Sequence, residues 1–197
     1  MPAGLVALIP ESTRKDNGGE PIRAPVDGFV SRLPPPRRQE LAALRAEIGR
    51  TSQPGTFLPA YLRFRGNMYR HIPEDAWENR HKDVEVLIVS GLYGLLESRD
   101  STVYYEHSMA EKTPPFGTLN YWWREHGLPG ILAAYLKATK PKTVIDLLSL
   151  EYRDAVKGFA DELSGLAVKE INFPGMGRAS QPLRGERIAA ILRTGKV

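Results

Sequence analysis

Three short apolar stretches of this sequence each end in residues that can do chemistry. Apolar runs of this length are typical of buried strands. Ligands of open α/β sheets bind outside the carboxyl ends of parallel strands. If the three strands are parallel neighbours, we therefore expect their ends to share one crevice. The stretches and the ends that follow them are Gly4 to Pro10 with Glu11 to Lys15, Val84 to Val89 with Ser90 to Asp100, and Thr143 to Leu150 with Ser149 to Tyr152.

The side chains expected to line this crevice carry hydroxyl groups, positive charges and carboxylates. Hydroxyls and cations suit phosphate or sugar hydroxyl groups, and a loop ending in Gly18 and Gly19 can cradle an anion with its backbone N–H groups. The loop lacks the order of a P-loop, and the alternative is a solvated loop after an edge strand. The residues of the crevice are Ser12, Thr13, Lys15, Ser90, Tyr93, Arg99, Asp100, Ser149, Glu151 and Tyr152.

A carboxylate beside a tyrosine, Glu151 next to Tyr152, suits acid/base or nucleophilic work at a glycosidic carbon. Tyr93 and Asp100 complete the catalytic candidates. The alternative is that Glu151 only caps the following helix, because a carboxylate is favoured at a helix amino end.

A second candidate site is the turn Pro174-Gly175-Met176-Gly177, which precedes Arg178 and Ser180. Glycine turns ahead of a helix occur in helix-hairpin-helix DNA-binding elements, where exposed N–H groups hold a phosphate. Val168 to Phe173, however, has the pattern of a strand and not of the required first helix. The alternative is a plain β–α turn.

The composition restricts the classes of protein and site. The chain has 197 residues, 42% of them hydrophobic and 25% charged, and no cysteine. This excludes disulfides and thiol catalysis, and four scattered histidines predict no zinc site. We expect no cofactor. A net charge of +4 is compatible with nucleic acid or nucleotide partners. No run is long enough to span a membrane, so we expect a cytoplasmic protein.

Alternating strand and helix patterns predict a single α/β domain over residues 1–197, with a mixed, largely parallel sheet flanked by helices. Helices are expected at Arg37 to Arg50, in two pieces within Thr118 to Lys137, at Arg153 to Leu163 and at Leu183 to Arg193. Alternating polar and apolar residues predict a half-buried strand at Phe57 to Tyr69. We expect a short apolar turn at Leu92 to Leu96 and an edge strand at Leu166 to Phe173.

Several of these segments resemble the peroxide stress protein YaaA family. Val89 to Asp100 (VSGLYGLLESRD) is similar to its Ser-Gly-Leu-Tyr-Gly-Leu-Leu signature, and Phe64 to Tyr69 to its Phe-x-Gly-x-x-Tyr element. Leu147 to Val156 resembles its Leu-Ala-Ser-x-Glu-Tyr motif, and ALIPEST resembles its first strand and loop. The resemblance departs at Glu97 to Asp100, where the family has Arg-Pro-Leu-Asp.

The resemblance implies a compact α/β fold, a role in limiting iron-driven oxidative damage, and affinity for DNA. Our leading hypothesis is a cytoplasmic YaaA-like protein that binds nucleic acid or a nucleotide and acts in peroxide stress. The alternative is an enzyme that acts on a nucleoside or nucleotide, with Glu151 as nucleophile or base and with Lys15, Arg99 and Arg178 holding phosphate. A third interpretation is a scaffold protein with no ligand in the crevice.

Overall fold

The computed structural model describes residues 3–50 and 55–197. Its centre is a five-stranded sheet in the order β4-β3-β1-β8-β9. The strands β1 (Leu5–Pro10), β3 (Val84–Ser90), β8 (Thr143–Asp146) and β9 (Ala167–Glu170) are parallel, and β4 (Gly94–Glu97) is antiparallel to β3. This confirms the α/β class and the mixed, largely parallel sheet. It also confirms that the three apolar stretches are parallel neighbours with adjoining carboxyl ends.

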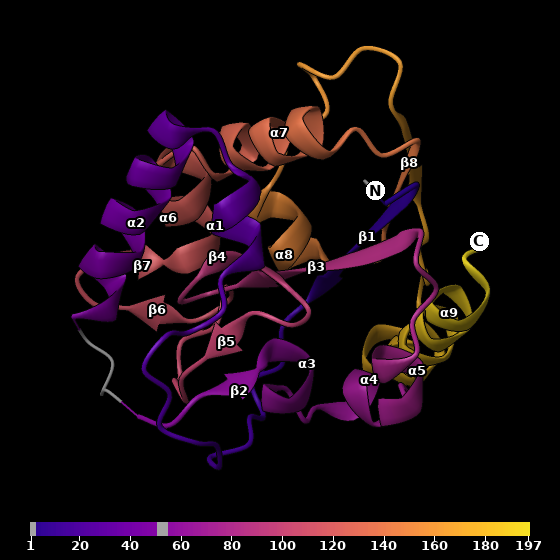
Figure 1. The fold of residues 1–197 in the computed structure, drawn as a ribbon, viewed down its shortest axis with the longest axis horizontal. Coiled ribbons are helices and arrows are strands. Elements are labelled where there is room, and N and C mark those ends of the chain that lie inside the picture. The colour runs from indigo at the N-terminus through magenta and orange to yellow at the C-terminus, as the bar shows by residue number, and fades with distance from the viewer. Residues whose placement is uncertain (1–2, 51–54) are drawn as a thin grey trace.

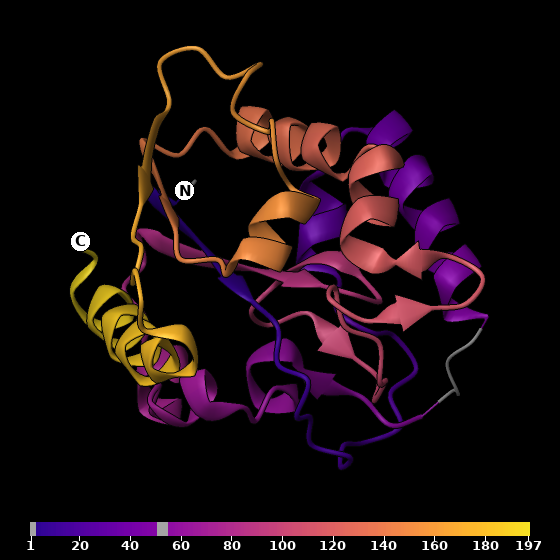
Figure 2. The ribbon, with the colours of Figure 1, turned by 180° about the vertical axis from the view of Figure 1, so that it is seen from behind.

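Helices cover both faces of this sheet (Figures 1 and 2). On one face lie α1 (Gly28–Arg32), α2 (Pro35–Gly49), α6 (Leu119–Glu125), α7 (Leu128–Thr139) and α8 (Leu150–Ala155). On the other lie α4 (Asn67–Arg70), α5 (Glu74–Glu78) and α9 (Ser180–Thr194), which is preceded by the 3₁₀ turn η1 (Gly177–Ala179). The remaining elements are α3 (Ala60–Arg63), β2 (Leu58–Pro59), β5 (Ser101–Thr102), β6 (Lys112–Thr113) and β7 (Gly117–Thr118).

The two central strands are apolar because both of their faces are covered. All residues of β1 and β3 are buried, as expected for parallel strands between two helical layers. The edge strand β9 is mostly exposed and carries Lys169 and Glu170. Within the described residues, no helix combines the length and apolar character needed to span a bilayer.

The prediction of a strand at Phe57 to Tyr69 was wrong. Beyond the short β2, this stretch forms α3 and α4. The alternation suggested that Arg63 faces solvent, but this residue is fully buried. Its guanidinium donates hydrogen bonds to the backbone carbonyls of Asp16, Gly18, Thr56 and Thr102. A buried arginine satisfied by carbonyl groups cannot be told from an exposed one by sequence pattern.

Two other predicted boundaries were wrong. The turn expected at Leu92 to Leu96 is mostly the strand β4, which folds back along β3 as a hairpin. Its apolar residues reflect burial on both faces. The helix expected at Arg153 to Leu163 is α8, which ends at Ala155 and is followed by turns. Gly158 has a φ of +91°, which is not a helical conformation.

The hairpin is joined to α1 by Asp100, which is 1% exposed. Its carboxylate accepts hydrogen bonds from the backbone N–H groups of Gly28, Phe29 and Glu97. Buried N–H groups without a partner are costly. Asp100 therefore anchors the amino end of α1 against β4.

We expect Asp100→Ala to lower the free energy of unfolding by about 3 kcal/mol, because it leaves buried N–H donors without an acceptor. Asp161→Ala, at an exposed turn, is the control and is expected to leave stability unchanged. Urea unfolding followed by circular dichroism measures both. Equal midpoints for the two variants would contradict this role of Asp100.

Candidate functional site

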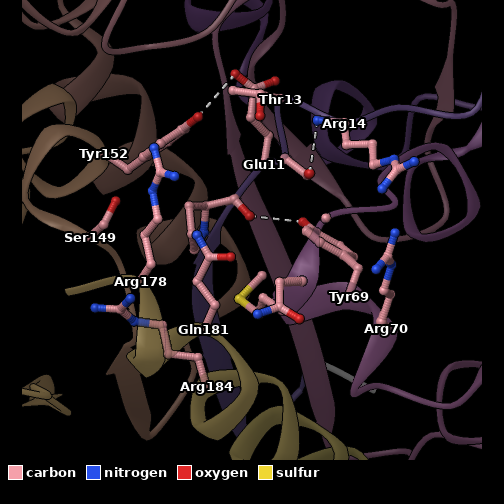
Figure 3. A pocket seen from close by; sticks show the side chains of 15 residues that line it. Glu11, Thr13, Arg14, Tyr69, Arg70, Ser149, Tyr152, Arg178, Gln181 and Arg184 are labelled. Carbon is pink, nitrogen blue, oxygen red and sulfur yellow. Dashed lines mark hydrogen bonds between the residues drawn. The ribbon is translucent and has the colours of Figure 1, made fainter. Parts of the chain in front are cut away.

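A cavity of about 520 Å³ lies at the carboxyl ends of β1 and β8. Its walls come from the loop after β1, from α4, from the start of α8, and from η1 with α9 (Figure 3). The parallel strands thus bring together segments that are far apart in the sequence, as the strand-end rule predicts. The lining residues are Pro10, Glu11, Ser12, Thr13, Arg14, Gly66, Asn67, Met68, Tyr69, Arg70, Ser149, Tyr152, Arg178, Gln181 and Arg184.

Four arginines give the cavity a strong positive charge. Figure 3 shows Arg14 and Arg70 on one side and Arg178 and Arg184 on the other. Within the described part of the chain, none of the four forms an ion pair with a carboxylate. Uncompensated guanidinium groups around a cavity favour an anion, and their planar forks suit phosphate oxygens.

The guanidinium of Arg184 is held in place, but one of its hydrogen-bond donors has no acceptor among the described residues. Its Nη1 donates to Oγ of Ser180 at 2.8 Å, and the group lies 5.2 Å from the ring centre of Phe173. Its Nε is buried and has no hydrogen-bond partner among the described residues. Burial and the nearby Arg153 lower the pKa of Arg184 from its ordinary value. Asp146 and Glu151 act to raise this pKa. The buried Nε is therefore the observation that indicates a donor without an acceptor.

Two glycines allow the walls to approach each other. A Cβ on Gly185 of α9 would lie 2.2 Å from the carbonyl oxygen of Met68, so only glycine lets α9 pack this closely on α4. A Cβ on Gly66 would lie 2.1 Å from Oγ of Ser12. A larger residue at position 185 would push α9 and its arginine away from α4, and one at position 66 would displace the Ser12 side chain.

Beneath the cavity lies the carboxyl group of Glu11, whose side chain is fully buried. Its Oε1 accepts a hydrogen bond from the backbone N–H of Gly91 at 2.8 Å, and its Oε2 accepts one from the Tyr105 hydroxyl. The Tyr152 hydroxyl, which borders the cavity, lies 3.5 Å from Oε1. Burial raises the pKa of Glu11, although Lys15 and these donors act in the opposite direction.

Lys15 is the buried counter-ion of this carboxylate. Its Nζ lies 3.8 Å from Oε2 of Glu11 and 4.2 Å from the ring centre of Tyr105, and its side chain is fully buried. Burial lowers the pKa of Lys15, while Glu11 acts to raise it. Lys15 therefore points into the interior and does not line the cavity.

Of the residues predicted from sequence, Ser12, Thr13, Ser149, Tyr152 and Arg178 line the cavity. Their positions follow from the strand ends: the first two follow β1, the next two begin α8, and Arg178 lies in η1.

Ser90 and Tyr93 lie close to this site but behind its wall. The Ser90 hydroxyl is 2.6 Å from that of Tyr105, and the rings of Tyr93 and Tyr105 meet edge to face at 5.7 Å. The Tyr93 hydroxyl accepts a hydrogen bond from the N–H of Val103. Both residues support Tyr105, which in turn holds Glu11.

Arg99 and Asp100 are not brought into the cavity. The antiparallel course of β4 carries them back along β3, away from its carboxyl end. Arg99 is exposed and donates to the carbonyl of Glu78 at 3.0 Å, at the end of α5. Burial raises the pKa of Asp100 to about 7, against the effect of the N–H groups of Glu97 and Gly28.

Glu151 is exposed in the first turn of α8 and is not among the lining residues. The same helix turns Tyr152 inward, so adjacent residues of the motif face opposite ways. The role assigned to Glu151 stays a prediction.

The glycine turn follows β9 and continues into η1, so a strand precedes it where a helix-hairpin-helix has its first helix. Gly175 and Gly177 are exposed and have φ values of +73° and +49°, which serve the β–α turn. Ser180 is buried, donates to the carbonyl of Gly177 at 2.6 Å and accepts from Arg184. This turn therefore positions Arg178 and Arg184.

Several residues of the site were assigned no role by sequence pattern: Glu11, Asn67, Tyr69, Arg70, Tyr105 and Gln181. Arg184 was expected to add positive charge beside the glycine turn. Glu11 and Arg14 belong to the strand-end loop that the pattern did select. Asn67 was missed because its segment was assigned to a strand, and Arg70 lies one residue beyond that segment. Within the described residues, no group of three His, Cys, Asp or Glu side chains is arranged to hold a metal ion.

We expect Glu11→Ala and Lys15→Met each to lower the free energy of unfolding by about 3–5 kcal/mol, because each leaves a buried charge unpaired. The double variant should cost clearly less than the sum of the two single changes. Urea unfolding of all four proteins measures this coupling. The exposed pair Lys137 and Glu162 is the control, and its cycle should show no coupling. Additive effects at Glu11 and Lys15 would contradict a buried ion pair.

Comparisons with known proteins give a family model and several curated relatives. The family model of the peroxide stress protein YaaA matches residues 37–179. A UPF0246 protein from Ruegeria sp. (strain TM1040) is 32% identical over 132 residues, which are 56% of this chain and 53% of that protein. One from Streptococcus pyogenes serotype M4 (strain MGAS10750) is 28% identical over 151 residues, 72% of this chain and 59% of the relative. The chain thus spans about half the length of the curated relatives it matches. Because the family model covers most of the sequence, the chain belongs to the peroxide stress protein YaaA family.

Proposed function

We propose that this chain binds a nucleotide or nucleic acid through phosphate groups in the strand-end cavity, and that it does so in the cytoplasm as part of protection against peroxide stress. The observation that carries the proposal is the set of four arginines without carboxylate partners around one cavity, within the described residues. The stress role rests on the family to which the chain belongs.

The hydroxyl and amide groups of the cavity support the same ligand class. Ser12, Thr13, Ser149, Asn67 and Gln181 can donate to phosphate or sugar oxygens. The carboxylate among the described lining residues is that of Glu11, which is buried and already hydrogen-bonded. An anion in the cavity therefore meets donors and cations and no exposed negative charge from these residues.

We expect the double variant Arg14→Gln/Arg70→Gln to weaken binding of a fluorescent oligonucleotide and to reduce the slope of log affinity against log salt by about one for each phosphate that is no longer neutralised. The matched control is Arg23→Gln/Arg187→Gln, which removes two exposed arginines outside the cavity. Fluorescence anisotropy over a salt series measures both. No salt-sensitive binding of nucleotide or oligonucleotide by the unaltered protein would overturn the proposal.

A second candidate function is an enzyme that acts on the N-glycosidic bond of a nucleoside or nucleotide. Hydrolysis adds water across the bond between the sugar carbon and the base nitrogen. It releases the free base together with the sugar from a nucleoside or the sugar phosphate from a nucleotide. The observation that favours it is the Glu11 carboxyl, whose pKa is raised by burial and which lies against the Tyr152 hydroxyl at the cavity. Tyr152 would contact the substrate, with Glu11 positioning it. The sequence prediction assigned the catalytic carboxylate to Glu151.

Liquid chromatography of a mixed nucleotide pool incubated with the protein decides whether base is released and which carboxyl is needed. We expect release to be abolished in Glu11→Gln and Tyr152→Phe and retained in Glu151→Gln, because Glu151 lies outside the cavity. Near-ultraviolet circular dichroism checks that the variants are folded. Unchanged nucleotides with the unaltered protein would rule out this enzyme, and release abolished only in Glu151→Gln would support the sequence prediction.

A further inference from the structure

The arginines of this site surround one half-open cavity. Proteins that hold strands without regard to sequence use a basic groove that tracks the backbone. Here four arginines from separate segments surround a cavity of about 520 Å³, within the usual size of small-molecule sites. A duplex is far too wide to enter such a cavity. The shape therefore suits one nucleotide at a time.

The cavity offers little surface for stacking bases. Single-strand binding proteins stack successive bases on open aromatic faces. The two aromatic residues of this lining, Tyr69 and Tyr152, are 5% and 8% exposed. Their hydroxyls are also engaged, since Tyr69 donates to the Pro10 carbonyl at 2.9 Å and Tyr152 contacts Glu11. Recognition therefore depends on the phosphate and not on a run of bases.

The charge of the cavity exceeds what one phosphodiester supplies. A diester carries one negative charge, whereas a phosphate monoester carries about −1.5 to −2 at neutral pH and three acceptor oxygens. The buried Nε of Arg184, without a partner among the described residues, adds a need for acceptors at this wall. Ser180 and the close α4–α9 contact at Gly185 hold Arg184 before any ligand arrives. A preorganised group of this kind loses less entropy on binding.

We infer that the cavity selects a nucleotide phosphate monoester, either on a free mononucleotide or at the phosphorylated end of a strand, over the internal phosphodiesters of nucleic acid. This inference rests on the proposed function and specifies its ligand. A free mononucleotide and a strand end present the same phosphate monoester, and a competition experiment between the two distinguishes them. A free mononucleotide fills the same cavity as a strand end and therefore competes with it.

The test uses single-stranded oligonucleotides of one sequence, with no terminal phosphate, a 5′-phosphate or a 3′-phosphate, and a nucleoside 5′-monophosphate as competitor. We expect one phosphorylated end to raise affinity about tenfold or more, as one or two charge-assisted hydrogen bonds would. Arg184→Gln should abolish this difference, and Arg187→Gln, an exposed arginine of the same helix, should retain it. Isothermal titration calorimetry measures each affinity.

The pH dependence gives a second readout. The second phosphate pKa is about 6, so affinity for the phosphorylated strand should fall as the pH is lowered from about 7.5 to about 5.5, while affinity for the unphosphorylated strand stays constant. If the mononucleotide displaces the phosphorylated strand, a free nucleotide is a ligand of the cavity. If the terminal phosphate raises affinity but the mononucleotide does not displace the strand, the cavity binds strand ends only. Equal affinity with and without a terminal phosphate would overturn the inference. The proposed function would still stand if that binding weakened with salt and in Arg14→Gln/Arg70→Gln.

Discussion

The buried ion pair between Glu11 and Lys15 fixes the geometry on which the strand-end site depends. Glu11 directly follows β1 and accepts a hydrogen bond from the N–H of Gly91, which directly follows β3, so one carboxylate joins two neighbouring strand ends. The carbonyl of Gly91 accepts a further hydrogen bond from Nε1 of Trp123 in α6. A buried charge is tolerated only with such complete pairing. The Ser-Gly-Leu-Tyr-Gly segment thus serves as a support for this carboxylate.

The charges around the cavity above this support are unpaired, whereas those of the support are paired. Below it, Glu11 and Lys15 are paired; around it, Arg14, Arg70, Arg178 and Arg184 have no carboxylate partner in the described structure. Clustered cations repel one another, and this repulsion opposes folding. Sites at which local rules of stability are broken are expected to be functional. The close contact at Gly185 adds to this, since it keeps the arginine-bearing α9 near α4.

The sequence was sufficient for the parallel strands of the sheet and for the edge at which the cavity lies, but not for the antiparallel strand β4. The apolar runs of β1, β3 and β8 are long enough to be recognised, and their parallel order brings Ser12, Ser149 and Tyr152 to one edge. It was not sufficient for side-chain direction. Lys15 has the sequence pattern of an exposed loop cation, but its side chain is buried because it pairs with Glu11. Glu151 and Tyr152 are adjacent, and only the seating of α8 decides which one faces the cavity.

Contacts between segments far apart in the sequence could not be predicted either. Arg99 and Asp100 follow the signature closely, but the antiparallel hairpin carries them away from the strand ends. Arg70 reaches the cavity because α4 packs on α9, a contact between segments that are far apart in the sequence. No local pattern reports such a contact, which depends on the absence of a side chain at Gly185.

The most direct test of the central claim is a crystal structure of the protein grown with a nucleoside 5′-monophosphate. We expect the phosphate group in the strand-end cavity, within hydrogen-bonding distance of Arg178 or Arg184 on one wall and of Arg14 or Arg70 on the other. A nucleotide bound elsewhere on the surface, with the cavity arginines making no contact to it, would contradict this claim.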